Sequence, residues 1–590
     1  MKITNSNSEA KRELFSELYE NAKAALSDVF ADFEKHMAQY RGSDEIDGSA
    51  ERASTVRNIT YEIVESQVSS DIPFPKVDPS YHNERREKNA VAAEKLAAVL
   101  RDRLPFEALN DIDERYTYIY GGSVWYVEWD NSIRVGAEIG GVRIHCLSPT
   151  SFIPQPGICN VADMEYCFLK FTTTRGELTR KYGVSDEAAV LAEADFSFGE
   201  DDSFGDTVNV IVCFYKNELG EIGQFIFSGE LTLSDVESYY RRKRTVCKRC
   251  SCDAEKCLCA APLFESEDMK YEYISAAELP SDDERFSGVG GGISVPYYLP
   301  TSFPIVIRRN TSTEGLLYGQ SDCAYIRPEQ QAINKIESRI LQKLLRAGVT
   351  PVMPEDASVT LNNSVFGQVI RMKPGESAEQ YGKVDTTPDV SQDMKEAERL
   401  YDHAKRVLGI SDAFQGIDMN GNESGYAKQL RISQATGRLE SKRKMKYTAY
   451  TEIDRIIFEH YLAFADEARL LYYKDEYGRV KESEFRRTDF IEYDSKSGRY
   501  YYDDSYLFSV DLNGGSEYQR EALWQRNLEN LNAGTLGDKS ELATLLRYWQ
   551  CQERAHYPHA RENVEYFRAA IDELQKEKRK KEKEERKQKK

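Results

Sequence analysis

The feature that most constrains this 590-residue chain is a proline-free stretch of about 40 residues, from Ser424 to Asp466. Its composition favours a helix, Ser424 is a suitable N-cap, and Gly437 is its one internal residue of low helix propensity. At 1.5 Å per residue such a helix is about 60 Å long. Helices of this length form coiled coils, membrane spans or architectural struts.

Charge and hydropathy exclude several of the classes open to such a chain. The 99 acidic and 79 basic residues give a net charge of −20, which does not attract nucleic acid or an anionic membrane. Aromatic residues make up 11% of the chain, too many for a disordered protein. No apolar run approaches the roughly 20 residues of a membrane helix, and the polar start lacks the features of a signal peptide. We expect a soluble protein of several domains that stays where it is made.

The segments before the long helix predict an α+β fold. Apolar residues recur at helical spacing over Ala10–Tyr40 and Val91–Leu104, with an extended proline-containing segment at Ile72–Pro75. From Tyr116 to Val306 apolar residues tend to recur at every second position, in aromatic and β-branched runs broken by turn residues. These patterns indicate a helical N-terminal part followed by a β-rich domain.

Two shorter helices are predicted directly before the long one. Pro328–Ala347 and Val390–Leu408 carry apolar residues at steps of three and four, and Pro328 is placed at a first helical position. They bracket an excursion rich in proline and glycine, residues 348–388, and are followed by a polar loop, residues 409–423. Beyond the long helix, residues 467–514 return to strand character and residues 515–574 to helices. The basic tail, residues 575–590, is expected to be solvated and disordered, to extend the last helix or to touch nucleic acid.

The sharpest chemical signal is a cluster of five cysteines within thirteen residues. A structural zinc needs four soft ligands, and the neighbouring Lys and Arg side chains would favour the thiolate forms. Five candidates leave the ligand set open, and free thiols or a redox or iron–sulfur role are the alternatives. The candidate ligands are Cys247, Cys250, Cys252, Cys257 and Cys259.

The sequence gives no comparable signal for catalysis. None of the seven histidines lies in a recognisable nucleophilic or metalloprotease pattern, and His556 and His559 fit a loop contact better than a metal site. The glycines of residues 288–292 lack the lysine and flanking elements of a phosphate-binding loop. We therefore expect a protein that is not an enzyme.

The first half of the long helix is basic within an acidic chain. Such a run is either a solvated helix face or a surface held near DNA phosphates. The candidate DNA-facing residues are Arg438, Lys442, Arg443, Lys444 and Lys446.

The order of these elements resembles that of the portal proteins of tailed bacteriophages, over roughly residues 50–570. The match rests on the succession of helix, excursion, helix, loop and long helix from Pro328 to Asp466, and on several phrases. These phrases are Arg57–Glu65, Tyr120–Trp125, Leu147–Phe152 and Glu423–Ala427. The cysteine cluster is not part of this resemblance and looks like an insertion.

This resemblance implies a ring of subunits, usually twelve, with double-stranded DNA passing along its axis at one capsid vertex of the virion, after assembly in the host cytoplasm. Implied partners are further copies of the chain, the large terminase subunit, the major capsid or scaffold protein and a head-completion adaptor. The implied parts are a helical part of the wing (1–105), a β-rich wing (106–327) with the cysteine-rich insert (241–262), a stem helix (328–347), a clip (348–388), a second stem helix (389–408), a tunnel loop (409–423), a long spine helix (424–466), a β-rich return to the wing (467–514), a helical crown (515–574) and a charged tail (575–590). The tunnel-loop residues would be Asp412, Gln415, Asp418, Met419, Asn420, Asn422 and Glu423.

Three other classes stay open at the level of sequence. One is another phage head structural or adaptor protein, and one is an enzyme, which would have to bring distant carboxylates together. A zinc-knuckle nucleic-acid-binding protein would use the cysteine cluster together with the basic run Arg241–Arg249, and would bind nucleic acid in a salt-sensitive manner.

Overall fold

The computed structural model has the α+β class expected from the sequence: it is 50% helical and 26% strand. The strands form several small sheets rather than one large one. The structure describes residues 8–43, 55–81, 83–136, 138–193, 207–247, 264–276, 279, 284–286, 291–345, 349–352, 382–385, 388–410, 425–474, 480–511, 517–554, 557, 559–560 and 562–571.

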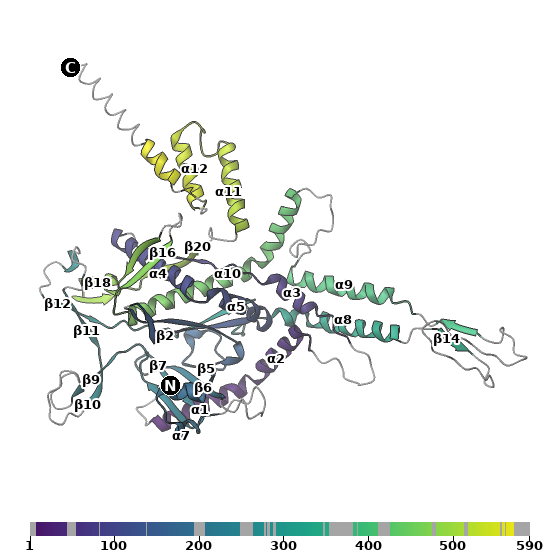
Figure 1. Cartoon of the computed structure of the whole chain (residues 1–590), viewed down its shortest axis with the longest axis horizontal. Coiled ribbons are helices and arrows are strands. Elements are labelled where there is room, and N and C mark those ends of the chain that lie inside the picture. The colour runs from purple at the N-terminus through teal and green to yellow at the C-terminus, as the bar shows by residue number, and fades with distance from the viewer. Residues whose placement is uncertain are drawn as a thin grey trace, which may run out of the picture.

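The long helix predicted from the sequence is confirmed. Helix α10 runs from Gly425 to Phe464, and its C-terminal half crosses the body of the molecule (Figure 1). Tyr450, Ile453 and Ile457 on this half are buried in a hydrophobic core shared with the strands on both sides. Because this core surrounds the C-terminal half of α10, that half of the helix lies in the interior of the body.

A three-stranded antiparallel sheet lies against α10. Its central strand β2 (Gly122–Val135) pairs with β13 (Ile305–Arg309) and with β3 (Glu138–Leu147). Trp125 of β2 is fully buried and makes an edge contact with Tyr450, the ring centroids being 5.5 Å apart. The chain enters β2 from helix α5 (Phe106–Tyr120) through Gly121, whose φ of +92° and close approach to a backbone carbonyl leave no room for a side chain.

A five-stranded antiparallel sheet forms the second layer. Its strands follow the order β4 (Phe152–Pro154), β5 (Tyr166–Thr174), β6 (Thr207–Lys216), β7 (Ile222–Ser228) and β8 (Leu231–Val236). Helix α1 (Ser8–Ala25) covers one face, where Phe15 contacts Tyr215 at 5.0 Å between ring centroids. Val212 and Phe214 point into a separate core on the other face. Burial on both faces explains why β6 reads as an almost continuous apolar run.

Smaller antiparallel ribbons complete the β structure. The ribbon of β1 and β20 joins the N-terminal and C-terminal parts of the chain, since its strands are far apart in sequence. The ribbons are β1 (Phe74–Pro79) with β20 (Tyr506–Asp511), β9 (Lys243–Cys247) with β10 (Phe264–Asp268), β11 (Tyr271–Ser275) with β12 (Gly292–Pro296), β14 (Val349–Val352) with β15 (Gly382–Asp385), β16 (Arg469–Lys474) with β17 (Val480–Phe485), and β18 (Ile491–Asp494) with β19 (Arg499–Tyr502). Strand character over residues 467–514 is therefore confirmed.

The helices differ from the sequence prediction at three places. The stretch Ala10–Tyr40 is two helices that break at Leu26, and the region predicted as β-rich from residue 106 opens with α5. The helix predicted from Val91 begins earlier because the Asn83 side chain accepts a hydrogen bond from the Arg85 amide and caps the helix. The remaining helices of the N-terminal half are α2 (Ser27–Arg41), α3 (Ile59–Gln67), α4 (Glu84–Arg103), α6 (Arg175–Tyr182) and α7 (Asp186–Ala189).

The helices predicted for residues 515–574 are present as α11 (Glu517–Asn532), α12 (Leu542–Arg554) and a helical segment over residues 562–571. Tyr557 contacts Trp524 of α11 and Trp549 of α12, with ring centroids 5.0 and 6.0 Å apart. This aromatic contact holds the two helices together above the ribbons (Figure 1).

Candidate functional site

The most distinctive part of the structure is a pair of helices that leaves the body. Helix α8 (Asp322–Leu345) runs outward and α9 (Ser391–Leu408) returns beside it, while the β14–β15 ribbon lies beyond their far ends (Figure 1). We call α8 and α9 together the projection. Ile326 and Ile333 of α8 share a core with Tyr401 and Ala404 of α9, so an apolar seam joins the two helices.

The start of α8 corrects the sequence prediction. Pro328 is not a first helical residue, because the helix begins six residues earlier at Asp322. Ser321 precedes it, and its hydroxyl accepts a hydrogen bond from the Cys323 amide at 3.0 Å, which satisfies one of the free N–H groups at this end. The second helix, in contrast, has its predicted C-terminal end at Leu408.

The projection leaves apolar side chains uncovered. On α9, Met394 is 57% and Val407 45% exposed, whereas the seam residues Ala397, Tyr401 and Ala404 face α8 or α3. The exposed apolar residues of α8 are Tyr325, Leu344 and Leu345. Burial of one such side chain is worth about 1.5–3 kcal/mol, so this arrangement favours packing against another surface.

A buried charged junction fixes the base of the projection to α10. Asp322, at the start of α8, is fully buried and accepts hydrogen bonds from Lys442 at 2.6 and 2.8 Å. Gln67 of α3 and Asn310 next to β13 donate to the same carboxylate at 2.9 and 2.8 Å. One carboxylate thus ties four segments of the chain together.

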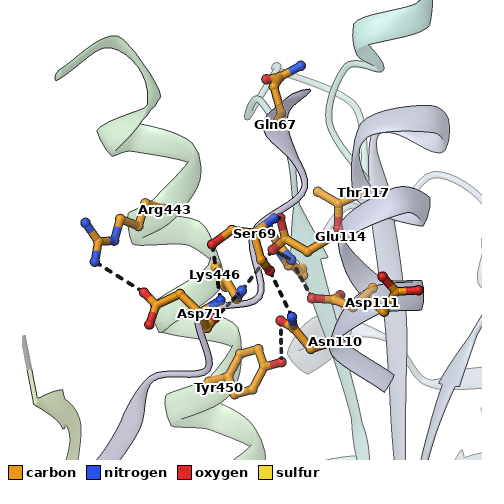
Figure 2. A network of polar contacts seen from close by, with 12 residues as sticks. Gln67, Ser69, Asp71, Asn110, Asp111, Glu114, Thr117, Arg443, Lys446 and Tyr450 are labelled. Atoms are coloured by element: carbon orange, nitrogen blue, oxygen red, sulfur yellow. Dashed lines mark hydrogen bonds and ion pairs between the residues drawn. The ribbon is translucent and has the colours of Figure 1, made fainter. Parts of the chain in front are cut away.

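The second half of the junction lies further along α10 (Figure 2). Lys446 forms an ion pair with Glu114 of α5 at 3.0 Å and also donates to the backbone carbonyl of Asp71. Arg443 forms an ion pair with the Asp71 carboxylate at 3.3 Å. Arg308, from β13, pairs with Glu114 at 2.7 Å and with the neighbouring Asp113.

The charges of this junction balance, which explains how it can be buried. The cations Lys442, Arg443, Lys446 and Arg308 are matched one for one by the anions Asp71, Asp113, Glu114 and Asp322. Burial alone would raise the pKa of Glu114, but the nearby Arg308 and Lys446 hold that pKa below its ordinary value. Burial lowers the pKa of Lys446. Removal of one partner from such a buried pair leaves an uncompensated charge, which costs about 3–5 kcal/mol.

Three of the candidate DNA-facing residues lie at this junction. Lys442, Arg443 and Lys446 point into the junction, and Lys446 is buried. The Arg443 side chain stays 29% exposed and that of Lys442 13% exposed. Lys444 is 68% exposed and pairs with Glu440 one turn earlier, while the Arg438 side chain lies outside the described residues.

Sequence reasoning missed the acidic half of the junction. Asp71, Asp113, Glu114 and Asp322 have no shared motif, and they lie in separate segments of the chain. One local signal was available, because Lys442 and Lys446 continue the helical stripe of the buried residues Tyr450, Ile453 and Ile457. Cations on the core face of a helix require buried anions nearby.

Other predicted site residues lie outside the part of the chain that the structure describes. These include the tunnel-loop residues Asp412, Gln415, Asp418, Met419, Asn420, Asn422 and Glu423. Cys250, Cys252, Cys257 and Cys259 also lie outside the described residues. The backbone of Cys247 is the last residue of strand β9, but its side chain is not described. Most of the predicted clip is likewise outside, apart from β14 and β15.

Two other features are absent from the residues that the structure describes. No group of three or more His, Cys, Asp or Glu side chains in that part of the chain could hold a metal ion. None of the described helices is long and apolar enough to cross a membrane.

No protein-family model matches the chain, and no curated protein has a significantly similar sequence.

Proposed function

We propose that this chain is a portal protein of a tailed bacteriophage, a ring-forming subunit of the channel through which DNA enters and leaves the capsid. The observation that carries the proposal is the projection: two antiparallel helices that leave the body and expose apolar side chains, followed in sequence by the long helix α10. A self-contained globule would instead fold such helices into its interior.

Contact between neighbouring copies would cover the exposed side chains of the projection. A ring closes when each subunit offers two different surfaces, one to each neighbour, and the rotation between neighbours is a fraction of a full turn. In this proposal the projections line up side by side as the stem, and the β-rich body forms the wing. The α11–α12 region forms the crown inside the capsid.

The partners in this proposal follow from the position of each part. The far end of the projection, with β14 and β15, meets the large terminase subunit during packaging and the head-completion adaptor later. The body meets the major capsid or scaffold protein. The ring assembles in the host cytoplasm and stays at one vertex of the virion, with double-stranded DNA along its axis.

The proposal is consistent with weak affinity for DNA. The chain is strongly acidic, and the cations Lys442, Arg443 and Lys446 are already paired within the subunit. The same reasoning disfavours the zinc-knuckle nucleic-acid binder. Arg241 pairs with Glu221 and Arg242 with Asp466, so these two cations are engaged inside the chain.

We also propose one structural zinc in the cysteine-rich insert. Strands β9 and β10 pair with Cys247 opposite Phe264, so the two ends of the segment that carries the other four cysteines lie side by side. Closely spaced thiolates on such a closed segment suit the tetrahedral geometry of zinc. The metal would hold the insert together and would take no part in a reaction.

The assembly state of the purified full-length chain tests the proposed function. We expect rings of about twelve subunits in negative-stain images and in mass photometry, as the resemblance implies. Met394→Glu and Val407→Glu should leave monomers with unchanged melting behaviour, because they place charges on the exposed face of α9. Leu219→Glu is the matched control, since Leu219 is 76% exposed on the body and away from the projection. Wild-type protein that stays monomeric at micromolar concentration would refute the proposal.

A further inference from the structure

A segment of four residues without regular secondary structure, Thr55 to Asn58, lies along helix α8; we call it the strap. Along the side of α8 that meets it, the helix carries a stripe of buried polar residues at four-residue intervals. These residues are Gln330, Asn334 and Ser338. A polar stripe on a helix inside a protein needs a hydrogen-bonding partner, and the strap provides it.

The contacts between strap and α8 involve backbone groups of the strap. The Ser338 hydroxyl accepts from the Thr55 amide at 3.2 Å and lies 3.3 Å from the Thr55 carbonyl oxygen. The side-chain NH2 of Gln330 donates to the Arg57 carbonyl at 2.8 Å, and its Oε1 accepts from the backbone amide of Thr60, in the first turn of α3, at 3.1 Å. The strap is thus fixed on α8 through its main chain, which leaves the Arg57 side chain available for other contacts.

The far end of the strap is held just as firmly. Asn58 caps helix α3, its side chain accepting from the Tyr61 amide at 2.9 Å. The same side chain donates to the carbonyl of Tyr40, in the last turn of α2, at 2.7 Å. The strap therefore belongs to the rigid body of the molecule, and any group it carries has a defined position.

Arg57 connects this fixed segment to both helices of the projection. Its guanidinium forms an ion pair with Glu398 of α9 at 2.8 Å and lies 3.7 Å from Glu337 of α8. It also lies over the ring of Tyr401 of α9, 5.2 Å from the centroid. A planar guanidinium suits this combination, since it can bond carboxylates at its edge while its face stacks on an aromatic ring.

Helix α9 has few apolar contacts of its own. Along α9, which the structure describes throughout, the buried apolar residues are Ala397, Tyr401 and Ala404, of which only Tyr401 is large. Leu400 and Leu408 are partly buried against the same core. Elements that bury little apolar surface open locally at low free-energy cost, so polar contacts decide how firmly α9 is held.

We infer that Arg57 is a positioning residue that holds α9 on α8. The geometry of the projection is then set by the strap together with the apolar seam between α8 and α9. This inference rests on the proposed function only for its consequence: a displaced α9 would present Met394 and Val407 to a neighbouring subunit at the wrong angle. The anchoring itself is a property of the single chain.

Hydrogen exchange of the full-length chain tests the anchoring directly. Arg57→Met keeps the aliphatic part of the side chain and removes the guanidinium. We expect the amides of α9 to exchange about fivefold faster in this variant, while the amides of α8 and of the body keep their rates. Arg399→Met is the matched control, because within the described part of the chain Arg399 pairs with Glu396 on α9 itself and not with the strap.

Arg57→Lys supplies a further comparison. Lysine restores the charge opposite Glu398 without the planar fork, so α9 should exchange at a rate between those of wild type and Arg57→Met. Equal acceleration in Arg57→Met and Arg399→Met would overturn the inference, as would equal acceleration of α8 and α9. All samples are compared at the same assembly state. A wild-type chain that fails to form rings refutes the proposed function, whereas the exchange result decides the role of Arg57 in either case.

Discussion

The buried His460 predicts a loss of stability in mild acid. It lies on α10 without solvent exposure, packed against the rings of Tyr239, Tyr240 and Phe464. Its Nδ1 donates to the Ile456 carbonyl at 2.8 Å, and Nε2 has no hydrogen-bond partner among the described residues. Burial lowers the pKa of His460 from 6.5 to about 4, although the Glu128 carboxylate opposes this effect.

The magnitude follows from the difference between the folded and unfolded pKa values. As the pH falls below 6.5, the unfolded chain binds a proton at this histidine while the folded chain does not. At 1.36 kcal/mol per pKa unit, the full loss is about 3 kcal/mol once the pH is below 4. Between pH 7.5 and pH 5 the loss is about 2 kcal/mol, and above pH 7 it vanishes.

Urea unfolding at pH 7.5 and pH 5, followed by tryptophan fluorescence, measures this effect. His460→Phe keeps an aromatic ring and removes the titrating group, so the difference in stability between the two pH values should shrink by about 2 kcal/mol relative to wild type. Phe464→Leu perturbs the same packing without removing a titrating group, and its pH dependence should equal that of wild type. An unchanged pH dependence in His460→Phe would refute the reasoning.

Three further predictions concern the junction, the insert and DNA. Lys442→Met leaves Asp322 buried without its cation and should lower the free energy of unfolding by about 3–5 kcal/mol in thermal or urea unfolding. Lys444→Met, at an exposed ion pair, should lower it by less than about 0.5 kcal/mol. Similar losses in the two variants would contradict the buried junction. Elemental analysis of protein purified under reducing conditions should find about one zinc per chain, lost in a Cys250→Ser, Cys252→Ser double variant, and a metal-free wild type would exclude the zinc proposal. Fluorescence anisotropy at 150 mM salt should detect little binding of free duplex DNA, and tight binding would favour the nucleic-acid-binding alternative.

Local structure was largely readable from the sequence. The long helix α10, the two helices of the projection and the strand character of residues 467–514 were predicted from periodicity and turn residues, because these signals depend on neighbours a few positions apart. Errors fell mainly at the ends of elements, apart from helix α5, which opens the region predicted as β-rich from residue 106. The start of α8 at Asp322 and the break at Leu26 depend on capping and on packing that periodicity does not record.

The charged junction was beyond sequence reasoning for a different reason. Arg443 and Asp71 are 372 positions apart, and the residues around each of them do not indicate that the two side chains pair. A basic run in a sequence is equally compatible with exposure to solvent, contact with phosphate groups or pairing with buried carboxylates. Only the packing of α10 against α3, α5 and α8 decides between these environments, because the cost of burying a charge depends on what lies within a few ångströms of it.

The sequence by itself determined that this is a mixed α+β protein built along one long helix, with a helix pair directly before it. The tertiary structure decided that this pair leaves the body rather than joining its core, and that Lys442 and Lys446 of the long helix pair with buried carboxylates. The reason is physical: periodicity specifies which face of a helix is buried, whereas the partner of that face is set by contacts between segments that are distant in the chain.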